Sequence, residues 1–435
     1  MTTTLKGNTL KSKLLALIAT LAVLLSAGLP AKAAPSEPAY QAINAQTVWD
    51  AGFTGEGTTI AIIDQGVNLS HPYFQGQIVD GFCFIDDSSY LCPNGSKQQS
   101  GVEAASQRSV AGWYVAAENH GNMVAGIVAG KPNNDAPGGI APKSKLLMAN
   151  VDLTVKGILA ALNYIDQRKE ELNIVALSMS FGGVFTEIPR QWLRCDTNPG
   201  LQQMTKVLKS LRNGGVIPFA SAGNTPTLDI ATSLFPSCLQ DAVAVGSVNQ
   251  ANGVSWYVTM SGKVELLAPD YAKSADTVGY LQAGGTSAAA PLAAGSYALL
   301  RQAFPKHSAE QVLTAMKVSG KPIDDVIRQD IPMVDLRASY LLLARTAVSG
   351  VLASAPAADQ KLNIGTFNGK IVVYAKGHKG QTLSWKIAGK WQKVTVTSDF
   401  QAFDRPTAAI GLPVTIELFL NGVTPAALTK TVVTK

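Results

Sequence analysis

The sequence predicts an α/β protein with a doubly wound parallel sheet, followed by a small all-β, sandwich-like region at the carboxyl end. Three observations support this: continuous apolar runs of strand length, helical stretches between them, and a change to alternating apolar and polar residues after about position 360. Runs without alternation are typical of parallel strands buried on both faces, whereas alternation indicates strands with one face in water. Strands that alternate with helices favour one parallel sheet covered by helices on both faces.

Length and composition define the class of protein. The chain has 435 residues, enough for two or three domains and one large buried core. With 46% hydrophobic and 15% charged residues, it is not a disordered or highly charged polypeptide. Four of its 36 basic residues and none of its acids lie in the first 33 positions, so the formal charge of +6 falls to +2 for the remainder. No nucleic-acid partner is therefore expected.

The first 33 residues have the pattern of a cleavable signal peptide. Lys6, Lys11 and Lys13 precede an apolar run of 16 residues at 14–29, and a stretch of small residues ends at Ala33. The run is shorter than the roughly 18 residues that a membrane span needs. We expect cleavage after Ala33 and a secreted or cell-surface protein. The alternative is an uncleaved membrane anchor.

The first domain is expected over 34–347, beginning with a short polar lead-in segment at 34–40. The apolar runs predict its strands at 58–63, 145–151, 174–178, 216–220 and 242–248. The stretches between and after them predict helices at 155–168, 201–212, 287–304, 308–318 and 336–347. Gly214 and Gly215 follow the second of these helices and favour its end there.

A change of composition separates a second domain. Residues 348–361 are rich in Ala and Ser around Pro356, as a linker would be, and the β domain is expected over 362–435. Asn-Gly pairs at 368–369 and 421–422 indicate turns, and strand-like stretches occupy 370–374 and 414–419.

The aromatic residues of the β domain allow two interpretations. Tyr374, Trp385 and Trp391 lie on strand-like stretches. They could stack on cell-wall sugars or peptides, but we favour the hydrophobic core of a small sandwich, which needs aromatic volume. The nearby lysines are interpreted as a solvated face. We expect an accessory module that could contact the cell envelope or another protein.

The four cysteines are interpreted in the light of export. Cys83, Cys92, Cys195 and Cys238 are an even set, which in an oxidising compartment favours two disulfides with three possible pairings. We expect the pairs Cys83–Cys92, which would close a short loop, and Cys195–Cys238. A zinc site is the weaker alternative, because the sequence has no Cys-x-x-Cys spacing and no histidine near these cysteines.

Three polar residues stand at places where chemistry could occur. Asp64 ends the apolar run 60–63, so it lies at the carboxyl end of a parallel strand, where open α/β sheets bind their ligands. His120 opens a helix of small and apolar residues. Ser287 follows a Gly-Gly-Thr turn and begins a long helix, whose amino terminus favours negative charge. Taken singly, each has a structural explanation, such as a loop carboxylate or a helix cap.

Taken together, the blocks around these residues resemble a known family. Asp-Gln-Gly at 64–66, Asn-His-Gly-Asn-Met-Val-Ala-Gly at 119–126 and Gly-Thr-Ser-Ala-Ala-Ala-Pro at 285–291 are similar to the three signature blocks of subtilisin-like serine proteases. The order Asp, His, Ser along the chain is also that of the subtilisin triad. Blocks at 178–183 and 220–224 extend the resemblance, which spans about 43–347 and implies a subtilisin-like fold for the first domain.

The resemblance implies a role for each matching residue. Ser287 would be the nucleophile, His120 the general base and Asp64 the group that orients the imidazole. Asn224 and the Ser287 backbone N–H would bind the oxyanion. The implied activity is that of an exported serine endopeptidase acting on polypeptides through an acyl-enzyme.

The resemblance also implies how substrate is bound. Ser180, Phe181 and Gly182 would form an edge that pairs with the substrate backbone as an added strand. Ala222 and Gly223 would line the same groove. Because such pairing senses backbone more than side chains, we expect broad specificity. A monomer is expected.

No cofactor is needed for this chemistry, and a structural calcium ion is left open. Residues 131–135, Lys-Pro-Asn-Asn-Asp, lie where many relatives have a calcium-binding loop. Oxygen ligands suit that ion. An Asn/Asp cluster beside Pro and Gly is also typical of a plain turn, and no metal ligand is assigned.

The sequence departs from the family pattern at several positions. Gln65, Asn122, Met123, Ala288 and Leu292 replace the family's usual residues beside the acid, the base and the nucleophile. Only about ten residues separate Ala33 from the first family-like positions, so we expect folding without a prodomain. These departures support an alternative from another class: a catalytically weak or inactive binding or adhesion protein at the cell surface. An esterase with the same triad is a third possibility.

Overall fold

The computed structural model describes most of the chain after the amino-terminal segment. The predicted signal peptide and all but the ends of the predicted linker lie outside the described residues. The described ranges are 37–86, 90–107, 119–182, 195–225, 234–259, 263–325, 328–349, 361–367, 370–378, 380–387, 390–396, 400–403, 413–421 and 426–433. None of the helices within these ranges is long and apolar enough to cross a bilayer.

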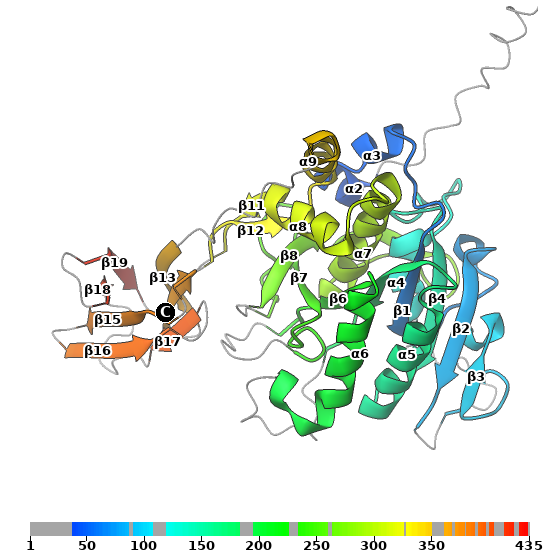
Figure 1. The fold of residues 1–435 in the computed structure, drawn as a ribbon, viewed down its shortest axis with the longest axis horizontal. Helices are drawn as coiled ribbons and strands as arrows, with labels where there is room; N and C mark the ends of the chain where they lie inside the picture. The colour runs from blue at the N-terminus through cyan, green and yellow to red at the C-terminus, as the bar shows by residue number, and fades with distance from the viewer. Residues whose placement is uncertain are drawn as a thin grey trace, which may run out of the picture.

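A ten-stranded sheet forms the centre of the first region (Figure 1). Its strands, in spatial order, are β11 (Lys321–Ile323), β12 (Ile331–Met333), β8 (Val264–Pro269), β7 (Val243–Val248), β6 (Ile217–Ser221), β5 (Ile174–Met179), β1 (Thr59–Asp64), β4 (Lys145–Val151), β2 (Ile78–Phe84) and β3 (Gln98–Ser100). Neighbours pair in parallel from β12 to β2, and only β11 and β3 at the two edges pair antiparallel.

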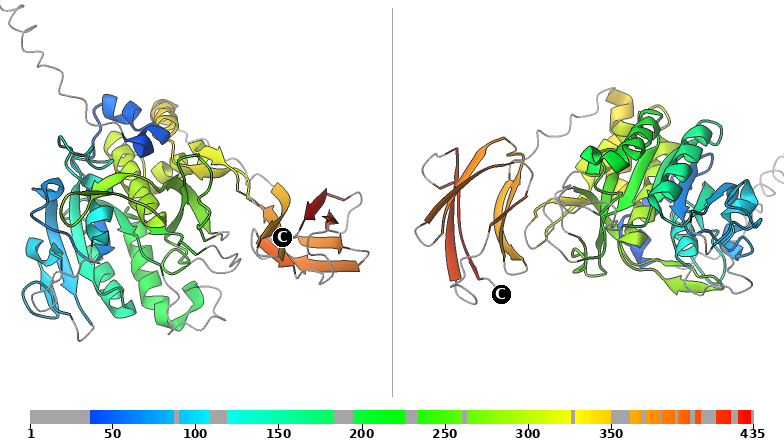
Figure 2. Two further views of the ribbon diagram at one scale, coloured as in Figure 1. Left: turned by 180° about the vertical axis from the view of Figure 1, so that it is seen from behind. Right: turned by 90° about the horizontal axis from the view of Figure 1, so that it is seen from below.

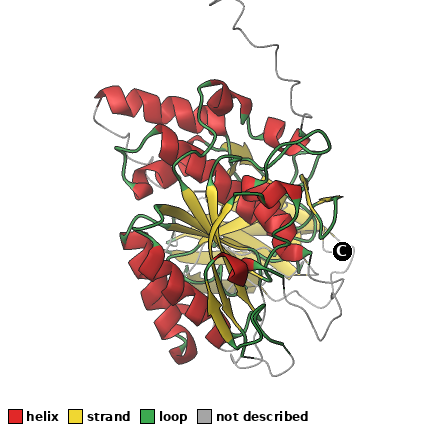
Figure 3. Ribbon diagram, turned by 90° about the vertical axis from the view of Figure 1, so that its right-hand side faces the viewer, coloured by secondary structure: helices red, strands yellow, loops and turns green. Residues whose placement is uncertain are grey.

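Helices cover both faces of this sheet (Figure 3). On one face, α5 (Val155–Arg168) and α6 (Gln202–Asn213) bury Ile158, Leu162 and Leu208 against the strands. On the other, α4 (His120–Ala129) and α7 (Thr286–Ala303) pack with α2 (Pro38–Ala42), α3 (Gln46–Asp50), α8 (Ala309–Ser319) and α9 (Leu336–Ser349) around a larger core. The prediction of a doubly wound α/β sheet is confirmed.

The predicted elements differ from the observed ones mainly where polar residues interrupt a run. β2 and β8 were not predicted, because Asp80 and Gly81 break the first and Glu265 breaks the second. The prediction of a polar lead-in segment over 34–40 was wrong for its last three residues, which begin a helix. Residues 38–42 form α2, and the Tyr40 hydroxyl donates to the Gly138 carbonyl at 2.8 Å from a buried position.

The carboxyl-terminal region consists of two small antiparallel sheets (Figure 2). One contains β13 (Lys361–Phe367), β14 (Lys370–Lys376) and β17 (Phe400–Phe403). The other contains β16 (Lys390–Thr395), β15 (Thr382–Ile387), β18 (Pro413–Leu420) and β19 (Leu428–Val433). Side chains from both, including Ile364, Val373, Trp385 and Leu418, share one core, as the predicted sandwich requires.

Of the three aromatic residues assigned to this core, only Trp385 belongs to it. Tyr374 is buried, but it alternates with the core residues Val373 and Ala375 and so lies on the other face of β14. The Trp391 side chain is 57% exposed and packs on Phe419 with ring centroids 4.9 Å apart. Trp391 pairs with Lys386 across the outer face of the sheet. Its position follows from strand register, which places successive residues on opposite faces.

Both predicted disulfides are present. Cys83 and Cys92 are joined with Cα atoms 5.8 Å apart, and Cys195 and Cys238 with Cα atoms 5.7 Å apart. The first closes a loop after β2. The second joins the segment before α6 to the segment before β7.

Candidate active site

The acid and the histidine meet at the carboxyl edge of the sheet. Asp64 is the last residue of β1 and is completely buried, whereas His120 is the first residue of α4. His120 Nδ1 lies 2.9 Å from both carboxylate oxygens of Asp64. Close approach of the two elements depends on glycine: a Cβ on Gly121 would lie 2.0 Å from the Gly66 carbonyl oxygen. The helix can therefore begin directly against the end of the strand.

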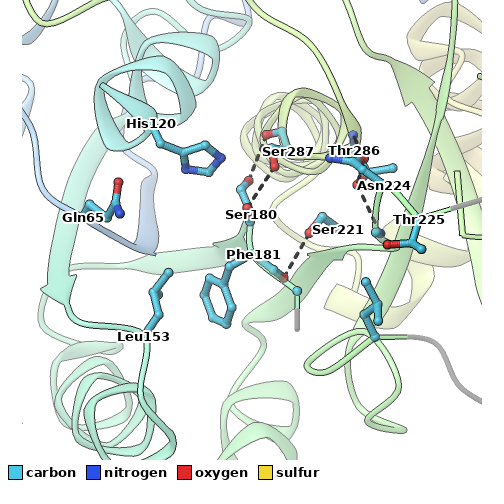
Figure 4. A pocket seen from close by; sticks show the side chains of 13 residues that line it. Gln65, His120, Leu153, Ser180, Phe181, Ser221, Asn224, Thr225, Thr286 and Ser287 are labelled. Atoms are coloured by element: carbon cyan, nitrogen blue, oxygen red, sulfur yellow. Dashed lines mark hydrogen bonds between the residues drawn. The ribbon is translucent and has the colours of Figure 1, made fainter. Parts of the chain in front are cut away.

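The charge of Asp64 dominates the electrostatics of this pair. The negative charge of Asp64 raises the pKa of His120 above its ordinary value, and partial burial of the ring opposes that rise. The His120 side chain is 32% exposed and that of Asp64 only 1%. Because Nδ1 is held by the acid, Nε2 is the ring nitrogen available to a reacting group, and the ring points toward Ser180 and Ser287 (Figure 4).

Ser287 stands in the first turn of α7, and its hydroxyl is held by Ser180, the residue directly after β5. Ser287 Oγ donates to the Ser180 carbonyl at 3.0 Å, and Ser180 Oγ donates to the Ser287 carbonyl at 3.0 Å. This reciprocal pair fixes the start of α7 beside the strand end. In this conformation the hydroxyl proton is directed at Ser180, so it must turn before it can be given to His120.

Asn224 has its side chain oriented by Thr286. The Asn224 Oδ1 atom accepts hydrogen bonds from the Thr286 backbone N–H at 2.9 Å and from its hydroxyl at 2.8 Å. The Thr286 hydroxyl itself accepts from the Gly223 N–H at 3.1 Å. With its oxygen committed in this way, Asn224 is left with its NH₂ group as a donor beside Ser287. Sequence reasoning did not single out Thr286, and its only signal was its place before Ser287.

These residues surround a pocket of about 500 Å³ (Figure 4). Ser180, Phe181, Gly182 and Gly223, assigned to substrate binding from the sequence, lie in its wall. Ala222 does not: it is 1% exposed, and its N–H bonds to β7. The complete lining consists of Gln65, His120, Leu153, Ser180, Phe181, Gly182, Ser221, Gly223, Asn224, Thr225, Leu234, Thr286 and Ser287.

Leu234 fills part of the pocket between its two glycine-lined walls. The Leu234 Cδ1 atom is 2.3 Å from where a Cβ on Gly223 would lie and 3.4 Å from the same point on Gly182. Its carbonyl accepts from the Ser237 hydroxyl at 2.7 Å and from the Cys238 N–H at 3.2 Å, so the residue is tied to the segment that carries the second disulfide. Nothing in the local sequence marked this leucine as a pocket residue.

Comparison with known proteins identifies the family. The model of the Subtilase family matches residues 55–331. The chain belongs to the subtilase family. It is 27% identical over 301 residues to the major intracellular serine protease of Bacillus subtilis, covering 67% of this chain and 81% of that protein. It is 30% identical over 289 residues to thermitase of Thermoactinomyces vulgaris, covering 64% and 88% respectively.

The fold agrees with a solved protease structure from Pseudoalteromonas arctica. The TM-score is 0.56 at 21% identity, covering 69% of this chain and 94% of that one. The matching relatives are named as proteases, and this subtilase is accordingly a serine protease of subtilisin type.

Most positions at which this subtilase departs from the family pattern lie beneath the site. Met123, Ala288 and Leu292 are buried in the core. Asn122 is fully buried, and its Oδ1 accepts from the Asn68 N–H at 2.7 Å. Only Gln65 reaches the pocket. Four of the five departures are therefore buried residues, and Asp64 and His120 remain in contact beside them.

The loop considered for calcium is organised as a turn. The Asn133 Oδ1 atom accepts from the backbone N–H groups of Asp135 and Ala136 at 3.0 and 3.1 Å, and its amide donates to the Tyr280 hydroxyl at 2.6 Å. This oxygen is thus already engaged by two donors. Within the described ranges, no three His, Cys, Asp or Glu side chains gather closely enough to hold a metal ion.

Proposed function

We propose that this subtilase is a serine endopeptidase that cleaves peptide bonds through an acyl-enzyme on Ser287. The observation that carries the proposal is the joint position of three groups on one pocket: the Ser287 hydroxyl, the His120 imidazole and, behind it, the buried Asp64 carboxylate 2.9 Å from Nδ1. In this proposal residues 34–347 form the peptidase domain and residues 362–435 an accessory domain.

In the first half of the reaction, the Ser287 oxygen attacks the peptide carbonyl carbon while His120 Nε2 takes the hydroxyl proton. The negative Asp64 stabilises the resulting imidazolium and keeps the proton of Nδ1 in place. The tetrahedral intermediate then expels the amine, which receives the proton from Nε2, and an ester to Ser287 remains. Water repeats the sequence on this ester, releasing the acid and restoring the serine.

Two donors stabilise the negative oxygen of the intermediate. The first donor is the Asn224 NH₂ group, because Thr286 holds the Asn224 oxygen and leaves the amide nitrogen to donate. The Ser287 backbone N–H, in the first turn of α7, is the second donor. Donors held in place before reaction need no reorganisation as the charge develops, which is why each is worth about 10²- to 10³-fold in rate.

Substrate is bound mainly through its backbone, which makes specificity broad at most positions. Residues 180–182 follow β5 at the pocket wall and offer an edge to an extended peptide. The side chain next to the scissile bond is the exception. Leu234 occupies the space between Gly182 and Gly223, so a small residue is preferred there.

Activity should depend on pH through His120. Only the neutral imidazole can accept the serine proton, and Asp64 raises the pKa of His120 above its ordinary 6.5. The rate constant kcat/KM is therefore expected to rise with pH, with a midpoint above 6.5. The same charge pair stabilises the fold while His120 is protonated, and that contribution is lost as pH rises through the raised pKa.

A fluorophosphonate probe tests the proposal against an inactive binding protein. The probe reacts only with an activated serine, so the full chain should be labelled and Ser287→Ala should not. The chain should also cleave a denatured protein substrate, and Ser287→Ala should lose this activity. A folded chain that is neither labelled nor active, with or without added calcium, would support the binding or adhesion alternative instead.

We also propose export through residues 1–33. The two disulfides support this, because such bonds persist mainly in oxidising compartments. Two of the matching relatives are named intracellular proteases, so family membership does not determine the compartment. Expression in the native host followed by amino-terminal sequencing tests it: a product beginning at Ala34 outside the cell is expected, and a product retained inside the cell with Met1 would contradict it.

A further inference from the structure

A tyrosine outside the pocket wall contacts the turn that carries Ser287. The Tyr257 hydroxyl accepts a hydrogen bond from the Gly285 N–H at 3.2 Å. On its other side it donates to the Asp270 carboxylate, which also receives the Ser255 hydroxyl. Asp270 is 8% exposed and directly follows β8. The three groups form a short chain from a buried acid to the residue two positions before the nucleophile.

The direction of these hydrogen bonds is set by chemistry. An ionised carboxylate can only accept, so the single phenolic proton of Tyr257 is given to Asp270. The phenol oxygen is left with lone pairs, one of which the Gly285 N–H uses. The carboxylate attracts the phenolic proton and leaves more electron density on the phenol oxygen, which makes that oxygen a better acceptor, because linked hydrogen bonds polarise one another.

Gly285 connects this series of hydrogen bonds to the residues around Ser287. Its φ of 78° is in the left-handed region, and it is the residue that caps α7. A Cβ at Gly285 would lie 2.8 Å from Asn224 Nδ2, so its backbone packs directly against the amide that faces the oxyanion. Displacement of Gly285 would change the spacing between Asn224 and the Ser287 N–H.

We propose that Tyr257, held by Asp270, is a positioning residue for the oxyanion donors of this subtilase. The inference rests on the proposed function, because it assigns the tyrosine a role in that same reaction. The substrate edge at 180–182 and Leu234 line the pocket, and Tyr257 is not among the lining residues. Its loss should therefore weaken stabilisation of the transition state while leaving binding of the ground state unchanged.

The test is Tyr257→Phe in the full chain, with Tyr271→Phe as the matched control. Tyr271 is 7% exposed and adjoins Asp270 in sequence, but none of the hydrogen bonds found within the described residues joins it to Gly285. Kinetics on a peptide anilide give kcat and KM, and a peptide boronic acid reports affinity for a transition-state analogue. Melting temperature shows whether each variant is folded.

For Tyr257→Phe we expect kcat to fall about 5- to 10-fold, roughly the value of one hydrogen bond, with KM unchanged. Boronate affinity should fall by the same factor. Tyr271→Phe should retain the kcat and boronate affinity of the parent. Asp270→Asn, which keeps an acceptor for the phenol, should lower kcat in the same direction and by less, and it provides the test if Tyr257→Phe does not fold.

Two outcomes would overturn the proposal. One is an unchanged kcat and boronate affinity in folded Tyr257→Phe. The other is an equal loss in kcat for Tyr271→Phe, which would indicate a general effect of removing a buried hydroxyl. Failure of the proposed function itself has a different signature, because the unaltered chain would then show no labelling by fluorophosphonate and no peptide hydrolysis.

Discussion

The two regions of this subtilase place their polar side chains in opposite ways. In the parallel sheet the strands are buried on both faces, so a functional polar group can emerge only where a strand ends or a helix begins, as Asp64, Ser180 and His120 do. In the carboxyl-terminal sandwich, polar and apolar residues alternate along strands such as β13 and β15. Trp385 faces the core there while its neighbour Lys386 faces outward with Trp391.

This difference explains why the candidate active site lies at the edge of the parallel sheet and not on the sandwich. Strand ends from distant parts of the chain converge at one edge of a parallel sheet, and groups that converge can react together. The outer face of a sandwich spreads its polar groups over a surface, which suits contact with another molecule. The two regions also have separate cores, and the ion pair between Lys361 and Asp330 joins their facing ends.

The largest expected effect is from Asp64→Asn. Removing the buried charge should lower kcat about 10⁴-fold, because the amide neither stabilises the imidazolium nor holds the proton on Nδ1. The residual activity should also show a lower midpoint on the acid side of the pH profile, since Asp64 is the main cause of the raised pKa of His120. Asp135→Asn, on an exposed loop, is the control. Full activity in Asp64→Asn would mean that the acidic strand end is not part of the reaction.

The second largest effect is expected from loss of the oxyanion donor Asn224. Asn224→Ala should lower kcat about 10²- to 10³-fold with a small change in KM, because it removes a donor used mainly in the transition state. Thr286→Val should give a smaller loss, since the Asn224 oxygen keeps the Thr286 backbone N–H as a partner. Steady-state kinetics with one peptide anilide measure both. Equal values of kcat for Asn224→Ala and the parent would show that Asn224 is not an oxyanion donor.

The third effect is on specificity. Leu234→Ala should raise kcat/KM about 10- to 100-fold for peptides with a large side chain before the scissile bond, because the space between Gly182 and Gly223 is opened. Peptides with alanine at that position should change little. Leu153→Ala, at another place in the same pocket, is the control. A peptide-library profile identical to that of the parent would show that Leu234 does not limit the substrate.

The smallest effect on hydrolysis is expected from the sandwich. Trp385→Ala should destabilise the carboxyl-terminal sandwich by about 3–5 kcal/mol, because a large buried ring is lost. Trp391→Ala, at an exposed position, should cost much less. Neither should change kcat on a peptide. Calorimetry together with kinetics checks both, and a parallel loss of activity in Trp385→Ala would show that the two regions are coupled.

The parts of the fold that the sequence predicted are those with strong local patterns. The continuous apolar runs of β1, β4 and β5 and the amphipathic α5 were located to within a residue or two at their ends. β2 and β8 were not predicted, because Asp80, Gly81 and Glu265 interrupt their apolar patterns. The two acids are satisfied by side chains of neighbouring elements, such as Arg168 for Asp80 and Lys317 for Glu265. α2 was not predicted, because a helix of five residues is too short to show a helical pattern of apolar residues.

For the candidate site, the sequence predicted the reacting groups but not the neighbouring residues that position them or shape the pocket. Asp64, His120, Asn224 and Ser287 could be chosen because each lies in a block resembling the family. The roles of Thr286, Leu234 and Tyr257 could not, because each depends on a contact with a distant segment, such as Leu234 with Gly182 or Tyr257 with Gly285. Ala222, by contrast, was chosen by its block and is buried away from the pocket.

The sequence by itself determined the strands and helices with strong local periodicity, and its even set of cysteines indicated two disulfides. Resemblance to the family then indicated the reactive residues. Tertiary structure decided which polar atoms face the pocket, how wide the pocket is beside Leu234, and on which side of its sheet Trp391 lies. The physical reason is the same in each case. Strand register and helix packing bring residues together from far apart in the chain, and a local pattern carries no information about those contacts.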